Sequence, residues 1–131
     1  MDEVTAEIVR QWLRKAEHDL LNICNNLAAA TIPTDTVCFH AQQAIEKLFK
    51  GLLVANGRHI AKTHDLVKLL TDVADLAPEL LPFEERLEEI SEYGVAVRYP
   101  DDYYEPTIDE ARHAYDTALA IQTIIVDKIQ F

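Results

Sequence analysis

Apolar residues recur every three or four positions along almost the whole of this 131-residue chain. Side chains at that spacing share one face of a helix, so each run predicts an amphipathic helix with a buried stripe. The runs predict helices over about 5–30, 35–56, 63–76 and 83–97, and from 107 to the end. No stretch alternates as a half-buried strand would. We therefore expect one all-α domain, residues 1–131, folded as an antiparallel up-and-down bundle of four to five helices.

Local signals mark several of the helix ends. Thr34 or Asp35 is expected to accept the free N–H groups at the start of the second helix, and Thr63 to cap the third. Gly57 suits a left-handed residue just past the second helix. Thr107, with a glutamate three positions later, forms a capping-box pattern at the start of the last helix.

Composition disfavours several classes of protein. The formal net charge of −11 disfavours non-specific binding to nucleic acid. No apolar run approaches the roughly 20 residues of a membrane span, and the acidic N-terminus is unlike a signal peptide, so we expect no membrane contact and a cytoplasmic location. Cys24 and Cys38 both lie in apolar helical patterns and are expected to be buried, reduced thiols. No metal-ligand or cofactor motif is present, so neither is expected.

The charge is unevenly distributed along the chain. Residues 40–68 carry five Lys or Arg against two acids, whereas residues 72–110 carry thirteen acids against two Arg. Within the basic part, four polar side chains fall in a sector of about 80° opposite the apolar face of the second helix; they are His40, Gln43, Lys47 and Lys50. Two ammonium groups one turn apart repel each other, so helix stability does not require them. This stripe is either a phosphate or nucleobase site or a solvated face.

The start of the third helix is a second candidate anion site. Lys62 and His64 lie beside the free N–H groups that a helix start offers to an anion. The alternative is that Thr63 caps the helix while His64 and Asp65 make local hydrogen bonds.

The loop before the last helix is a third candidate. Arg98 can clamp a phosphate through two hydrogen bonds, and Tyr99 or Tyr104 can stack on a base. Alternatively, Arg98 pairs with Asp101 or Asp102 and locks the loop. The acids of this loop are too weak a signal for a metal site, and no metal is predicted.

Four segments together resemble the HEPN domain, the higher eukaryote and prokaryote nucleotide-binding domain. Residues 12–20 (WLRKAEHDL) are similar to its opening helix, and residues 39–53 (FHAQQAIEKLFKGLL) to its most recognisable helix. Residues 62–70 (KTHDLVKLL) and 98–101 (RYPD) match its next two landmarks in order and spacing. The resemblance implies an all-α bundle that usually forms a homodimer. Members are commonly encoded beside a minimal nucleotidyltransferase, sometimes as a toxin–antitoxin pair, and others are metal-independent ribonucleases or bind nucleotides or RNA.

The ribonuclease branch of the family carries an arginine, four to six residues and then a histidine at the junction into the last long helix. Arg98 lies at that junction, but the matching positions hold Tyr103, Tyr104 and Glu105, and His113 is too far along the chain. A tyrosine with a pKa near 10 is a poor proton shuttle at neutral pH. The departure favours a protein that is not an enzyme. Tyr103 or Tyr104 could instead accept a nucleotidyl group from a partner.

These observations predict a small stand-alone HEPN-like protein that acts without catalysis. It would bind a nucleotide or RNA phosphate, or serve as an adaptor, as a homodimer paired with a minimal nucleotidyltransferase in a toxin–antitoxin-like system. The candidate ligand-binding residues are His40, Gln43, Lys47, Lys50, Lys62, His64, Arg98 and Tyr99. One alternative is a metal-independent endoribonuclease, in which Arg98 holds the phosphate and His64 or Tyr104 moves the proton. The other is a purely structural homodimer with the polar stripe buried at its two-fold axis.

Overall fold

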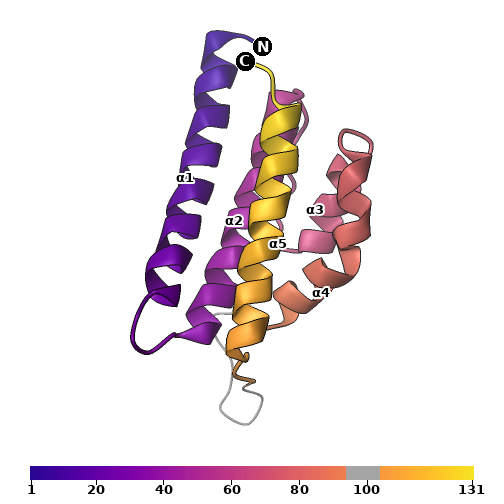
Figure 1. The fold of residues 1–131 in the computed structure, drawn as a ribbon. Coiled ribbons are helices and arrows are strands. Elements are labelled where there is room, and N and C mark those ends of the chain that lie inside the picture. Colours follow the sequence, from indigo (N-terminus) through magenta and orange to yellow (C-terminus); the bar gives the residue numbers. More distant parts are fainter. Residues whose placement is uncertain (94–103) are drawn as a thin grey trace.

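The protein is a bundle of helices (Figure 1). The computed structural model describes residues 1–93 and 104–131, and this part of the chain contains helices and no strand. The elements are α1 (Glu3–Leu27), α2 (Thr34–Ala55), α3 (Leu66–Val73), the 3₁₀ helix η1 (Pro78–Phe83), α4 (Glu84–Tyr93) and α5 (Ile108–Lys128). The predicted all-α bundle is confirmed.

Helix α2 is the centre of the bundle. It packs against α1, α3, α4 and α5, and it contributes more buried residues than any other helix. The chain descends through α1 and rises through α2; after α3, η1 and α4 it rises again through α5, so that both termini lie at the same end (Figure 1). Leucine, isoleucine, valine and alanine fill the shared core. Burial of these apolar stripes is the main force that holds the helices together.

Two of the predicted helix ends are confirmed. Gly57 has a φ of 68°, the left-handed conformation that glycine adopts without a steric penalty, just beyond α2. At the start of α5, the Glu110 N–H donates to Thr107 Oγ1 at 3.1 Å, and the Thr107 N–H donates to Glu110 Oε1 at 2.9 Å. These reciprocal bonds form the capping box that the sequence pattern predicts.

Two other ends differ from the prediction. Thr63 does not cap α3; the carboxylate of Asp65 does, accepting the N–H groups of Val67 and Lys68, while Thr63 Oγ1 accepts the Asp65 N–H. Aspartate and threonine are both good N-caps, and the helix begins after the later of the two. Helix α2 starts at Thr34, one residue earlier than predicted, and Pro33 before it offers no side-chain cap. Inside the first turn, however, Asp35 Oδ1 accepts the Thr36 N–H at 2.8 Å, so one of the two predicted residues does accept a free N–H group.

The two cysteines have different surroundings. Cys38 on α2 is buried, and burial raises the pKa of its thiol to about 12. Cys24 is exposed, so the expectation of a buried thiol is wrong for this residue. It follows the buried Ile23 on α1, and one residue is a rotation of about 100° around a helix, which carries Cys24 off the buried stripe. Among the described helices, none is long and apolar enough to cross a membrane.

Candidate functional site

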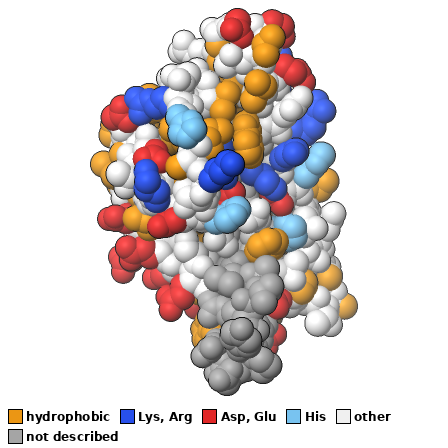
Figure 2. All heavy atoms as spheres, turned by 180° about the vertical axis from the view of Figure 1, so that it is seen from behind, with side chains coloured by type: hydrophobic (Ala, Val, Ile, Leu, Met, Phe, Trp, Pro, Cys, Tyr) orange, Lys and Arg blue, Asp and Glu red, His pale blue; other side chains and the backbone are white. Residues whose placement is uncertain are grey.

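The predicted polar stripe of α2, here called the α2 face, consists of His40, Gln43, Lys47 and Lys50. Seen from behind, the molecule shows Lys, Arg and His side chains gathered around a strip of hydrophobic side chains (Figure 2). The side chain of Lys47 is 22% exposed and that of Lys50 is 10% exposed. The stripe is therefore not a freely solvated surface, because its lysines are largely covered.

A carboxylate from α1 holds one end of the α2 face. Asp19 Oδ1 lies 2.8 Å from His40 Nδ1, and Lys47 Nζ donates to Asp19 Oδ2 at 2.6 Å. The Asp19 side chain is only 10% exposed, and a carboxylate is buried at tolerable cost only when it is paired. A carboxylate accepts hydrogen bonds, so Nδ1 of His40 carries the proton and Nε2 is the ring atom left for other contacts.

A second carboxylate holds the other end. Glu46 Oε2 accepts a hydrogen bond from Lys50 Nζ at 2.9 Å, and Glu46 Oε1 lies 2.8 Å from His64 Nδ1. The Glu46 side chain is 6% exposed, whereas that of His64 is 80% exposed. Glu46 thus ties the segment before α3 to α2 and presents an oriented imidazole at the surface. Lys50 Nζ also lies 5.8 Å from the centre of the Trp12 ring.

Two lysines near the α2 face keep their charge unpaired. Lys15 on α1 and Lys62 before α3 are exposed and form no ion pair with another described residue. Because Asp19 and Glu46 compensate Lys47 and Lys50, an arriving anion meets uncompensated charge chiefly at these two positions.

Gln43 is half-buried on the same face, and its amide makes no hydrogen bond with another described residue.

The remaining predicted site residues lie elsewhere or cannot be placed. Arg98 and Tyr99 fall outside the described residues. The Tyr104 hydroxyl donates to Glu110 Oε1 at 2.7 Å, and this bond is the main reason that the pKa of Tyr104 is raised. No described contact joins Tyr104 to the α2 face, so the structure does not bring Tyr104 together with His64.

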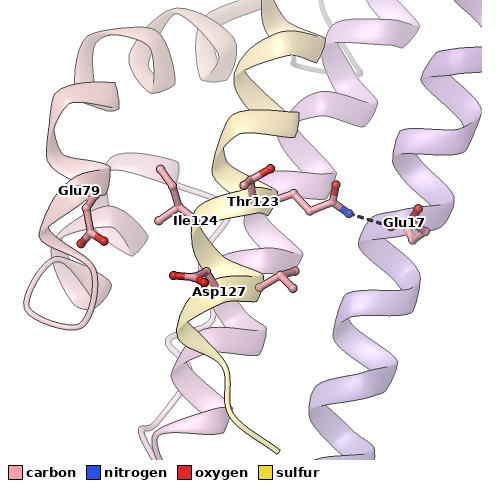
Figure 3. Close-up of a pocket in the computed structure, with 7 residues that line it drawn as sticks. Glu17, Glu79, Thr123, Ile124 and Asp127 are labelled. Atoms are coloured by element: carbon pink, nitrogen blue, oxygen red, sulfur yellow. Dashed lines mark hydrogen bonds between the residues drawn. The ribbon is translucent and has the colours of Figure 1, made fainter.

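A separate hollow lies elsewhere on the described surface, along α5 (Figure 3). This α5 groove has a volume of about 700 Å³ and is lined by Glu17, Glu79, Gln122, Thr123, Ile124, Val126 and Asp127. Gln122 Nε2 donates to Glu17 Oε2 at 2.7 Å across the seam between α5 and α1. Three carboxylates line the groove, so it repels phosphate. No cluster of three or more His, Cys, Asp or Glu among the described residues is suited to a metal ion.

Comparison with known proteins agrees with this architecture. The HEPN domain model matches residues 9–129. The chain belongs to the HEPN family. A crystal structure of an archaeal HEPN homologue superposes with a TM-score of 0.71 and 27% sequence identity, over 93% of this chain and 98% of that one. No curated protein matches the chain.

In this HEPN domain, three separate stretches of sequence converge on the α2 face. Residues 12–20 supply Asp19, residues 39–53 supply the stripe itself, and residues 62–70 supply His64. Sequence reasoning did not place either carboxylate among the site residues. A signal for Asp19 was available, because it lies within the buried stripe of α1, where a carboxylate requires a partner.

Proposed function

We propose that this HEPN protein binds a nucleotide or RNA phosphate at the α2 face without cleaving it. The observation that carries the proposal is that Asp19 and Glu46 each fix one imidazole through Nδ1 and one lysine. The imidazole edges are thereby held in place beside the unpaired Lys15 and Lys62. The ammonium groups donate charge-assisted hydrogen bonds to phosphate oxygens, and an imidazole whose Nδ1 faces a carboxylate does so through Nε2 when the ring is protonated.

Two further features support binding without cleavage. The chain has no histidine at the position that the ribonuclease signature requires. Tyr104, one candidate replacement, donates its hydroxyl proton to Glu110, and the raised pKa of Tyr104 makes it a worse proton carrier near neutral pH.

The proposal extends to the assembly. By analogy with its family, this protein would act as a homodimer and as an adaptor for a minimal nucleotidyltransferase, in a toxin–antitoxin-like pair. Light scattering of the purified protein, alone and co-expressed with such an enzyme, measures both associations. A monomer that does not change mass on co-expression would contradict this part.

Binding of a short, fluorescently labelled single-stranded RNA tests the phosphate site. We expect its anisotropy to give a dissociation constant that rises with salt between about 50 and 200 mM. Lys62→Gln should lower the slope of log K against log salt by about 0.7 to 1. Arg112→Gln is the matched control, because it removes one exposed positive charge from α5. Equal slopes for the two variants, or no binding by the wild type, would contradict the proposal.

A second candidate function has one observation in its favour. An imidazole held at Nδ1 by a buried carboxylate is the arrangement that prepares Nε2 for proton transfer. In a metal-independent endoribonuclease His64 would move the proton while Arg98 held the phosphate. RNA that stays intact with the wild type in chelator-containing buffer would exclude it, and cleavage lost in both His64→Ala and Arg98→Ala would give it first place.

A further inference from the structure

A smaller hollow lies on α1 and adjoins the α2 face, because Lys50 of that face contacts the ring of Trp12, which lines the hollow. Its volume is about 220 Å³, and it is lined by Ile8, Gln11, Trp12 and Lys15. Gln11, Trp12 and Lys15 follow Ile8 by three, four and seven positions, so the four residues lie on one side of the helix. Among the described residues, no side chain lining this hollow, here called the Trp12 hollow, forms a hydrogen bond. The Asp19 and Glu46 networks do not include any of the four.

The indole of Trp12 is held in a defined position. A Cβ atom on Gly51 would lie 3.3 Å from Trp12 Cβ, so the absence of a side chain there lets α2 approach α1 closely. Lys50 Nζ lies over one face of the ring, 5.8 Å from its centre, and Glu46 in turn fixes that lysine, so a stacking ligand would use the other face. The half-buried Trp12 ring is therefore already held in place at the surface, so the side chain loses little conformational entropy when a ligand stacks on it.

We propose that the Trp12 hollow is a nucleobase subsite, in which a base of a nucleotide or of single-stranded RNA stacks on the indole. This inference rests on the proposed phosphate-binding function. Sites for drug-sized ligands have volumes of roughly 300–1,000 Å³, so this smaller hollow suits one ring system, with the sugar and phosphate outside. Ile8 adds apolar surface, and the Gln11 amide offers both a donor and an acceptor to the edge of a base.

The position of Lys15 joins this subsite to the α2 face. It lies three residues after Trp12, about 4.5 Å along the helix axis, in the direction of Asp19 and its partner Lys47. A base stacked on Trp12 would therefore have its phosphate near an unpaired ammonium group and close to the His40 end of the network. This arrangement favours single-stranded or mononucleotide ligands, because bases in a duplex are not free to stack on a side chain.

The chain contains a single tryptophan, so its fluorescence reports on this hollow alone. The probes are a short oligoadenylate and an abasic oligonucleotide with the same number of phosphates. We expect the oligoadenylate to quench the Trp12 emission with the same dissociation constant that its anisotropy gives. The abasic strand should leave the emission unchanged and bind roughly 5- to 140-fold more weakly, the range expected for stacking of one base.

Two variants separate stacking from folding. Trp12→Leu keeps apolar packing but loses the aromatic plane, and should bind the two strands equally. Trp12→Phe keeps a ring and should retain part of the preference for the oligoadenylate, while circular dichroism confirms that both variants fold.

Each other outcome has a definite meaning. Equal binding of both strands by the wild type would overturn the base subsite and leave the phosphate site standing, whereas no binding of either strand would overturn both. If Trp12→Leu lowered self-association in light scattering but kept the preference for the oligoadenylate, the hollow would be a contact between two copies, and the proposal would be wrong.

Discussion

The α2 face and the α5 groove carry their charges in opposite ways. Beside the α2 face, the side chains of Asp19 and Glu46 are at most 10% exposed, and each binds one lysine and one histidine. In the α5 groove, Glu79 pairs with Lys128 at a half-exposed position, and the other carboxylates lie at the surface. The buried carboxylates fix the positions of the lysine and histidine side chains, whereas the exposed carboxylates mainly keep the surface solvated.

The comparison shows why a charge count along the sequence misleads. Residues 40–68 are strongly basic in sequence, yet the ammonium group of Lys47 is compensated by a carboxylate 28 positions earlier. Buried ion pairs contribute little net stability, because desolvation offsets their attraction. Their effect here is to orient two imidazoles, and this is the feature on which ligand binding would depend.

Removing a buried carboxylate and an exposed one should give the largest difference in the free energy of unfolding. Glu46→Ala leaves Lys50 buried without its partner and is expected to lower the free energy of unfolding by about 3–5 kcal/mol. Glu79→Ala removes an exposed pair, which water screens, and should change the free energy of unfolding far less. Urea unfolding measures both. The double variant Glu46→Met with Lys50→Met should recover most of the loss, and equal effects of the two single variants would contradict the comparison.

The fold could be predicted because its signals are local. The spacing of apolar residues, the capping box at Thr107 and the glycine at position 57 each depend on neighbours within about one helical turn. The structure confirms these features, because each helix and its apolar stripe are defined locally and tertiary packing only brings the stripes together.

The site could be predicted only in part, because its partners come from different helices. The stripe from His40 to Lys50 follows from helical spacing, but its pairing with Asp19 exists only after α1 packs against α2. The same holds for Trp12, whose approach to Gly51 depends on the distance between two helix axes. A carboxylate inside an apolar stripe was the one local sign that such a partner had to exist.

The third-helix cap offers a smaller test, at the boundary of the α2 face. Asp65→Ala removes the acceptor for two backbone N–H groups and should lower the free energy of unfolding by about 1 kcal/mol. Thr63→Ala removes a single bond to the Asp65 N–H and should have a smaller effect. Thermal unfolding of both variants measures the difference, and a larger effect at Thr63 would restore it as the cap that the sequence pattern suggested.

The smallest effect is expected at the start of α5, and it depends on pH. The Thr107 N–H and the Tyr104 hydroxyl both donate to the Glu110 carboxylate. These two bonds, with the larger effect from Thr107, lower the pKa of the carboxyl below the ordinary value of 4.5. The folded protein therefore binds fewer protons than the unfolded chain as pH falls toward that lowered pKa, so this stabilisation is complete above pH 4.5 and is lost on further acidification.

Glu110→Gln keeps the helix but removes the titrating carboxyl. The difference in the free energy of unfolding between wild type and this variant should be constant near neutral pH and shrink below 4.5. Tyr104→Phe removes only the second donor, so it should shift the acid limb less than Glu110→Gln does. Urea titrations of the three proteins at a series of pH values measure this. A difference that grew on acidification would mean that Glu110 is held in its protonated form, contrary to the capping geometry.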